Sequence, residues 1–179
     1  MKARMKAAVA SALVAAAAVA GTVAFADGGD SIRETLTGYE EDPLVLSTSG
    51  SGAFRATISA KGGQIRYQLS YADLEGGVQQ AHIHFGGRHQ SGGISAFLCT
   101  NVGGGPAGDP PQACPPAPAT ITGTITAKDV IGPVPQGIDA GELDELVAAI
   151  RGGVTYANVH TSKYPAGEIR AQLEQDTDD

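Results

Sequence analysis

The chain has 179 residues, a formal net charge of −7 and a pI near 5.0. This acidic balance excludes a nucleic-acid partner, because such a protein presents a basic face to the phosphates. Hydrophobic residues make up 42% of the chain, enough for one packed core, whereas 25 glycines and 10 prolines favour turns and short strands over long helices. The composition is typical of one small β-rich domain and excludes a helical membrane bundle, a coiled coil and a collagen-like rod.

The first 26 residues are predicted to be a cleaved signal peptide. Basic residues at the start precede an apolar stretch over residues 7–24, and Ala24 and Ala26 are the small residues that a signal peptidase reads. A membrane anchor is the alternative, but about 18 Ala-rich residues are marginal for crossing a bilayer. We therefore expect residues 27–179 to form one secreted or extracytoplasmic domain without a stable membrane anchor.

Cys99 and Cys114 are the two cysteines of the chain, and they flank a segment rich in glycine and proline. In the oxidising compartment that a signal peptide implies, such a pair is expected to form a structural disulfide. The alternative is a pair of metal ligands or a redox couple, which would favour the closer CxxC spacing. The sequence therefore predicts a Cys99–Cys114 disulfide.

Most of the remaining sequence is predicted to form short strands. Apolar and polar residues alternate on both sides of a turn at residues 61–63, which indicates a hairpin with one buried and one solvated face. Similar runs predict about eight strands, at residues 32–37, 54–60, 64–71, 78–85, 94–98, 120–127, 154–161 and 167–173. The expected fold is all-β, an antiparallel Greek-key-like sandwich or barrel.

One short crossover helix is predicted between the last runs. Its apolar positions recur at helical spacing: Leu143, Leu146, Val147 and Ile150. Asp139, followed three residues later by Glu142, is typical of a capping box, and Gly152 with Gly153 ends the helix.

Three histidines fall on one predicted face. His82 and His84 alternate with apolar residues in one strand, so both imidazoles point away from the core, and the same parity places His160 on the outer face of its strand. Imidazole is a ligand for zinc and for copper, so His82, His84 and His160 are candidate metal ligands, with Glu168 as the fallback third ligand. Two plainer interpretations are that these histidines organise loops through hydrogen bonds, or that they are ordinary exposed residues.

The parity argument adds polar neighbours to this face. Asn158, Glu168 and Arg170 fall on the same side as His160, in two strands expected to pair as a hairpin. We expect these side chains to form a solvent-exposed binding surface together with the histidines. Clustered imidazoles on such a surface would titrate near pH 6–7, so metal or ligand affinity would weaken in mild acid.

Two segments carry a resemblance to a known family. They are AHIHFG at residues 81–86 and YANVHT at residues 156–161, the latter followed by YPAGEIRAQL at residues 164–173. Together they resemble the CHRD (chordin) domain family. The resemblance implies an immunoglobulin-like β-sandwich or barrel in a secreted protein. In animal chordins such repeats belong to an extracellular antagonist of growth-factor signalling, a role that fold analogy alone would extend to this chain.

The histidines are also similar, more loosely, to the copper ligands of copper/zinc superoxide dismutases. Those enzymes place a His-x-His pair on one barrel strand and a further histidine on a later one, as His82, His84 and His160 do, and Arg170 is similar to their anion-steering arginine. The chain departs from that pattern because His89 is its only other histidine and the zinc loop is missing.

Two functions follow as expectations. The first is an extracellular binding or interaction module for an unknown ligand or protein, without enzymatic activity. The second is a copper- or zinc-binding protein with dismutase-like redox chemistry. A purely structural component of the cell envelope is a third possibility.

Overall fold

The computed structural model describes residues 29–176, so the predicted signal peptide lies outside the described residues. In this part of the chain eight strands form one antiparallel sheet, in the order β5-β4-β7-β8-β1-β2-β3-β6. The strands are β1 (Ser31–Thr37), β2 (Ser51–Ile58), β3 (Ile65–Ala72), β4 (Val78–Phe85), β5 (Gly93–Thr100), β6 (Ala119–Ile125), β7 (Thr155–Thr161) and β8 (Ile169–Gln172). The predicted all-β antiparallel fold is confirmed.

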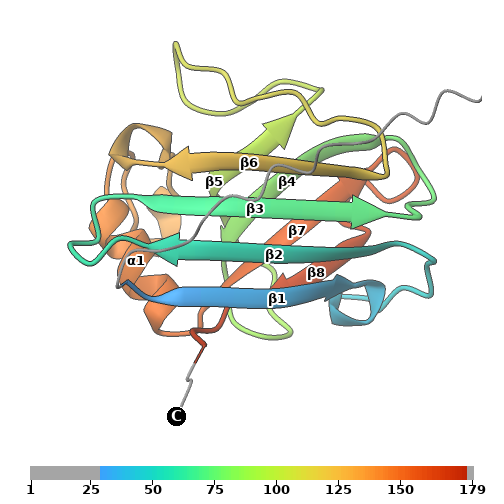
Figure 1. The fold of residues 1–179 in the computed structure, drawn as a ribbon, viewed down its shortest axis with the longest axis horizontal. Helices are drawn as coiled ribbons and strands as arrows, with labels where there is room; N and C mark the ends of the chain where they lie inside the picture. Colours follow the sequence, from blue (N-terminus) through green and yellow to red (C-terminus); the bar gives the residue numbers. More distant parts are fainter. Residues whose placement is uncertain (1–28, 177–179) are drawn as a thin grey trace, which may run out of the picture.

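The sheet folds over into two layers. Figure 1 shows β1, β2, β3 and β6 in one layer, with β4, β5, β7 and β8 crossing behind them at an angle. The turn between the layers lies at β1 and β8, which share the register pair Thr37 and Arg170. The result is a nearly closed sandwich, because only the two end strands, β5 and β6, are not directly paired.

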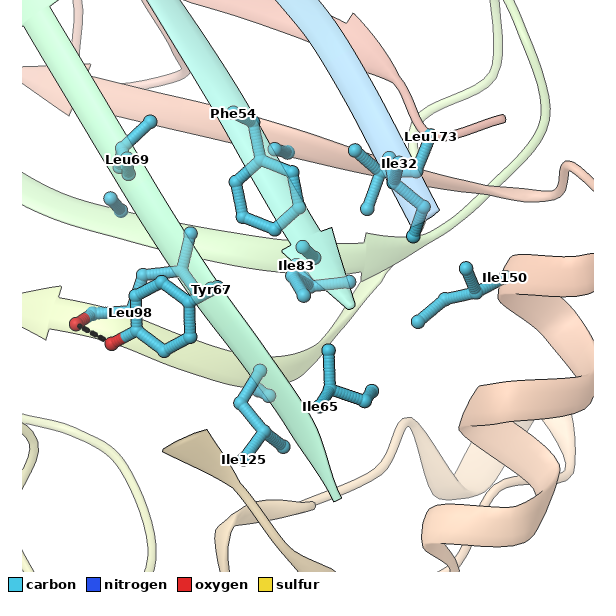
Figure 2. Close-up of a cluster of buried hydrophobic side chains, with 14 of the residues drawn as sticks. Ile32, Phe54, Ile65, Tyr67, Leu69, Ile83, Leu98, Ile125, Ile150 and Leu173 are labelled. Carbon is cyan, nitrogen blue, oxygen red and sulfur yellow. Dashed lines mark hydrogen bonds between the residues drawn. The ribbon is translucent and has the colours of Figure 1, made fainter. Parts of the chain in front are cut away.

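Alternate residues of both layers fill the space between them (Figure 2). Phe54 and Tyr67 stack in the layer of β2 and β3, with ring centroids 6.4 Å apart, and Ile83 and Leu98 face them from β4 and β5. Burying each large apolar side chain contributes about 1.5–3 kcal/mol to stability. This core requires the polar residues of β4 and β7 to point to the opposite face, where the candidate site lies.

The gap between β5 and β6 is sealed by the segment that carries the predicted disulfide. Cys99 at the end of β5 is bonded to Cys114, as expected. Gln112 lies between them in sequence, and its Nε2 donates to the carbonyl of Leu98 on β5 at 3.3 Å and to that of Thr122 on β6 at 3.0 Å. The first half of β5 is contacted by Ile131, whose N–H donates to the Ser95 carbonyl at 2.9 Å.

The predicted helix is present as α1 (Leu143–Arg151), and it closes one end of the sandwich (Figure 1). Leu146 and Ile150 are fully buried against the core. The predicted capping box is formed only in part: the Glu142 carboxylate accepts the Asp139 N–H at 2.7 Å, but Glu142 is itself the N-cap residue and no side chain caps the helix. Short 3-10 turns occur at η1 (Gly38–Glu40), η2 (Ala127–Asp129) and η3 (Val134–Gln136). Within residues 29–176, no helix is long and apolar enough to cross a membrane.

Candidate metal centre

Strands β4 and β7 bring the three histidines together. The two strands pair so that His82 lies opposite Asn158, and His160 lies opposite Gln80 on the same sheet. The ring centroid of His82 is 4.8 Å from that of His160 and 5.3 Å from that of His84, and the last two are 5.7 Å apart. One ring nitrogen from each histidine lies within 4.8 Å of the other two. This spacing allows three imidazoles to contact one ion after small side-chain adjustments.

The rings point away from the sandwich core, as their parity predicts, but they are not exposed. Ala81, Ile83 and Val159 are in the core, whereas His82, His84 and His160 are on the other side of the sheet, with exposed fractions of only 1%, 7% and 8%. The expectation of a solvent-exposed cluster is therefore wrong. A further layer of chain covers this face of β4, β7 and β8.

The connection between β4 and β5 supplies part of that cover, and we call residues 86–92 the strap. Arg170 on β8 donates through Nη2 to the carbonyls of Gly87 and Gln90, each at 3.0 Å. The neighbouring Gln172 donates to the Gly86 carbonyl at 3.1 Å. These long-range bonds tie the strap over β7 and β8.

Two of the histidines are oriented by backbone carbonyls. Nδ1 of His84 lies 3.0 Å from the Gly92 oxygen, and Nδ1 of His160 lies 3.1 Å from the Pro165 oxygen. A carbonyl oxygen only accepts, so each Nδ1 carries the proton and each Nε2 presents a lone pair. Metal-binding histidines commonly have this arrangement, with one nitrogen fixed by a carbonyl and the other free for the ion.

The remaining ring nitrogens are buried without partners. Within the described residues, Nε2 of His84, Nε2 of His160 and both nitrogens of His82 have no hydrogen-bond partner. Buried polar atoms nearly always have a hydrogen-bond partner, and leaving such an atom without one costs about 1–3 kcal/mol of stability. Four such atoms in one cluster indicate a place that a ligand would complete.

Burial also sets the protonation of the cluster. It lowers the pKa of His82 to about 2, with the neighbouring His160 and His84 rings adding to the effect. Burial lowers the pKa of His84 to about 4 and, although the Pro165 carbonyl opposes it, lowers that of His160 as well. The pKa values of the three histidines are therefore shifted downward from the expected range of 6–7. The imidazoles are neutral at pH 7 and able to act as ligands.

Aromatic rings line the cluster on two sides. Phe97 on β5 meets His82 edge to face, with centroids 4.4 Å apart, and Tyr156 on β7 stacks on His84 at 4.7 Å. The Arg170 guanidinium lies over the other face of the Tyr156 ring, 3.5 Å from its centroid. Tyr156 thus stands between His84 and Arg170, and its hydroxyl accepts the Gly92 N–H at 3.1 Å.

The polar residues expected to form a binding surface are buried instead. Asn158 donates to the Glu41 carboxylate at 2.7 Å and to the Ile169 carbonyl at 3.0 Å. Glu168 accepts bonds from the Thr48 hydroxyl, the Thr161 hydroxyl and a backbone N–H at 2.6–2.7 Å. The group of side chains spaced to hold one ion consists of His82, His84 and His160, and the Glu168 carboxylate lies outside it. These side chains fix the covering segments to the sheet.

The candidate residues predicted from the sequence do not include two residues of this region. Alternation places Tyr156 on the outward face with His160, but it does not show that the Tyr156 ring stacks on His84. Glu41 had no signal, because it lies outside every strand and is buried only by tertiary contacts. Burial raises the pKa of Glu41 to about 7, although the Asn158 hydrogen bond and Arg170 oppose the shift.

Fold and site together define an all-β sandwich that carries a buried histidine cluster on the outer face of one layer. Residues 32–173 match the family model described as the CHRD domain, and the chain belongs to that family. Its CHRD domain is an extracellular-type binding module in general terms. No curated protein and no solved structure compared with the chain matches it.

Proposed function

We propose that this CHRD domain is a secreted module that binds one copper or zinc ion through His82, His84 and His160. The observation that carries the proposal is the convergence of three neutral imidazoles whose Nε2 atoms are buried without partners. Copper and zinc both accept imidazole nitrogen, and a bound ion would compensate the cost of those unmade interactions.

Two alternatives account for less of the site. A role in organising loops explains the Nδ1 bonds of His84 and His160 but leaves the other ring nitrogens unpaired. Dismutase-like chemistry would use Arg170 to attract an anion, yet this guanidinium is buried, donates to two strap carbonyls and is separated from His84 by Tyr156. These contacts favour holding the ion over redox turnover.

The remaining polar residues are proposed to act by positioning. Asn158, Glu168 and Arg170 hold the covering segments in place through the bonds described above, and so keep the cluster closed. If the domain also binds an extracellular protein or other ligand, that contact would use a surface other than these buried side chains.

Metal analysis of exported protein purified without a histidine tag tests the proposal. We expect one copper or zinc ion per chain after loading, and a rise in melting temperature because the ion binds the folded state. The variants His84→Gln and His160→Gln should lose both effects. His89→Asn is the matched control, because His89 is exposed and adopts a positive φ of 59° that asparagine tolerates. A wild-type chain that binds neither metal would overturn the proposal.

A further inference from the structure

We propose that the histidine cluster selects monovalent copper, held by the three imidazoles alone, over Zn²⁺ and Cu²⁺. This inference rests on the proposed metal-binding function and names its ligand. It follows from the number of donors, from their enclosure and from the charge around them.

The donor number is the first argument. Among the described residues, His82, His84 and His160 form the metal-competent group without a fourth histidine, cysteine or carboxylate. Protein-bound Zn²⁺ is almost always four-coordinate, and Cu²⁺ favours tetragonal sites with at least four ligands. Cu⁺ has a filled d shell and is satisfied by three nitrogen donors in a plane.

The enclosure is the second argument, because a solvent molecule could otherwise complete a zinc site. His82 is 1% exposed and packs against Phe97, while the Tyr156 ring covers His84. The Tyr156 hydroxyl, which could approach as an oxygen donor, is engaged with Gly92 of the strap. Two sides of the cluster are therefore formed by aromatic rings that supply no free ligand atom.

The charge is the third argument. The three ligands are neutral, and the carboxylates of Glu41 and Glu168 accept hydrogen bonds from other side chains. The buried Arg170 guanidinium lies just beyond Tyr156 and adds positive charge to the region. The penalty for burying an ion rises with the square of its charge, so a monovalent ion is much less costly here than a divalent one.

The rest of the chain offers little competition for Cu⁺. Its usual soft ligands are thiolates and thioethers, but both cysteines are in the disulfide, and the two methionines are Met1 and Met5. Apart from these, His89 is the one histidine outside the cluster. Cu⁺ bound to the exported protein would therefore report directly on His82, His84 and His160.

Anaerobic competition against a chromophoric Cu⁺ chelator, beside a matched titration with a Zn²⁺ indicator, tests the selectivity. We expect one Cu⁺ per chain, bound on the order of 100-fold or more tightly than Zn²⁺, with X-ray absorption showing three nitrogen scatterers. His160→Gln should abolish tight Cu⁺ binding, whereas His89→Asn should retain it.

A designed variant makes the test sharper. Phe97→His places a fourth imidazole beside His82 and should raise Zn²⁺ affinity about 10-fold or more, whereas Phe97→Leu, which adds no donor, should not. If wild type binds Zn²⁺ as tightly as Cu⁺, or holds Cu⁺ with four ligands, the selectivity is refuted while the metal site stands. Binding of neither ion refutes both. If Phe97→His fails to fold, the metal affinities and the Cu⁺ coordination number of the wild-type protein still decide whether the cluster selects Cu⁺.

Discussion

His84 and Tyr156 lie opposite each other on β4 and β7, and their rings stack in parallel with centroids 4.7 Å apart. Arg170, from the next strand, β8, covers the other face of Tyr156. Three neighbouring strands thus contribute one column of stacked side chains, which fixes the His84 ring beneath the strap. The outer face of this layer is therefore packed like an interior, and its residues are expected to respond to substitution as core residues do.

Replacing Tyr156 tests the importance of that column. Tyr156→Leu removes both ring contacts and leaves space, so we expect a loss of about 2–4 kcal/mol in the free energy of unfolding. Tyr156→Phe keeps the ring and loses only the bond to Gly92, which costs about 1 kcal/mol. Urea denaturation of both variants provides the measurement. Equal losses in the two would show that the stacking contributes little.

Acid should destabilise the metal-free protein through its histidines. The pKa of His82 falls from 6.5 to about 2 on folding and that of His84 to about 4, so the folded state binds fewer protons than the unfolded chain. Their contribution is complete above pH 6.5 and is lost as the pH falls toward 4, by roughly 1.4 kcal/mol per pH unit for each group. Denaturation midpoints at several pH values measure this.

The variant His82→Phe isolates one of these groups. It replaces the imidazole by a ring that does not titrate, so the loss of stability between pH 6.5 and pH 4 should become shallower than in wild type. His89→Asn is the matched control, because it removes an exposed imidazole outside the buried cluster. Identical slopes in wild type and His82→Phe would contradict the buried, neutral state of His82.

Glu41 should act in the opposite direction. Its pKa is raised from 4.5 to about 7, so the folded state binds more protons than the unfolded chain between these values. Stability from this group is greatest below pH 4.5 and declines as the pH rises to 7. Glu41→Gln keeps an oxygen acceptor for Asn158 without the charge, and we expect it to be more stable than wild type by about 2 kcal/mol at pH 8. The difference should vanish at pH 4; a constant difference at both pH values would point to packing instead.

Removing the disulfide should destabilise the sandwich at its open side. Cys99 and Cys114 lie 15 positions apart in the sequence, and a loop of that size predicts a loss of about 3 kcal/mol for the Cys99→Ala/Cys114→Ala variant. Hydrogen exchange should show the loss of protection first in β5 and β6, because Gln112 between the cysteines joins these strands. Unchanged exchange in both strands would contradict this role for the segment.

Alternation along the strands could predict much of this architecture, because a sheet with one buried face imposes period two on its sequence. It placed His82 and His160 on the correct side of β4 and β7. It could not predict their burial, since the strap has no periodicity and is positioned by Arg170 and Gln172 from a strand far away in sequence. The titration expected near pH 6–7 was wrong for the same reason, because the pKa of a histidine depends on its solvent exposure more than on strand parity.

The segment that joins the two end strands has a consequence beyond stability. Exposed strand edges offer unpaired backbone groups to other chains and are a common starting point for aggregation. Here the carbonyls of Ser95, Leu98 and Thr122 on β5 and β6 are already engaged by partners from the same molecule. The contacts within the molecule therefore leave fewer free backbone groups on β5 and β6 to which a strand of another chain could pair.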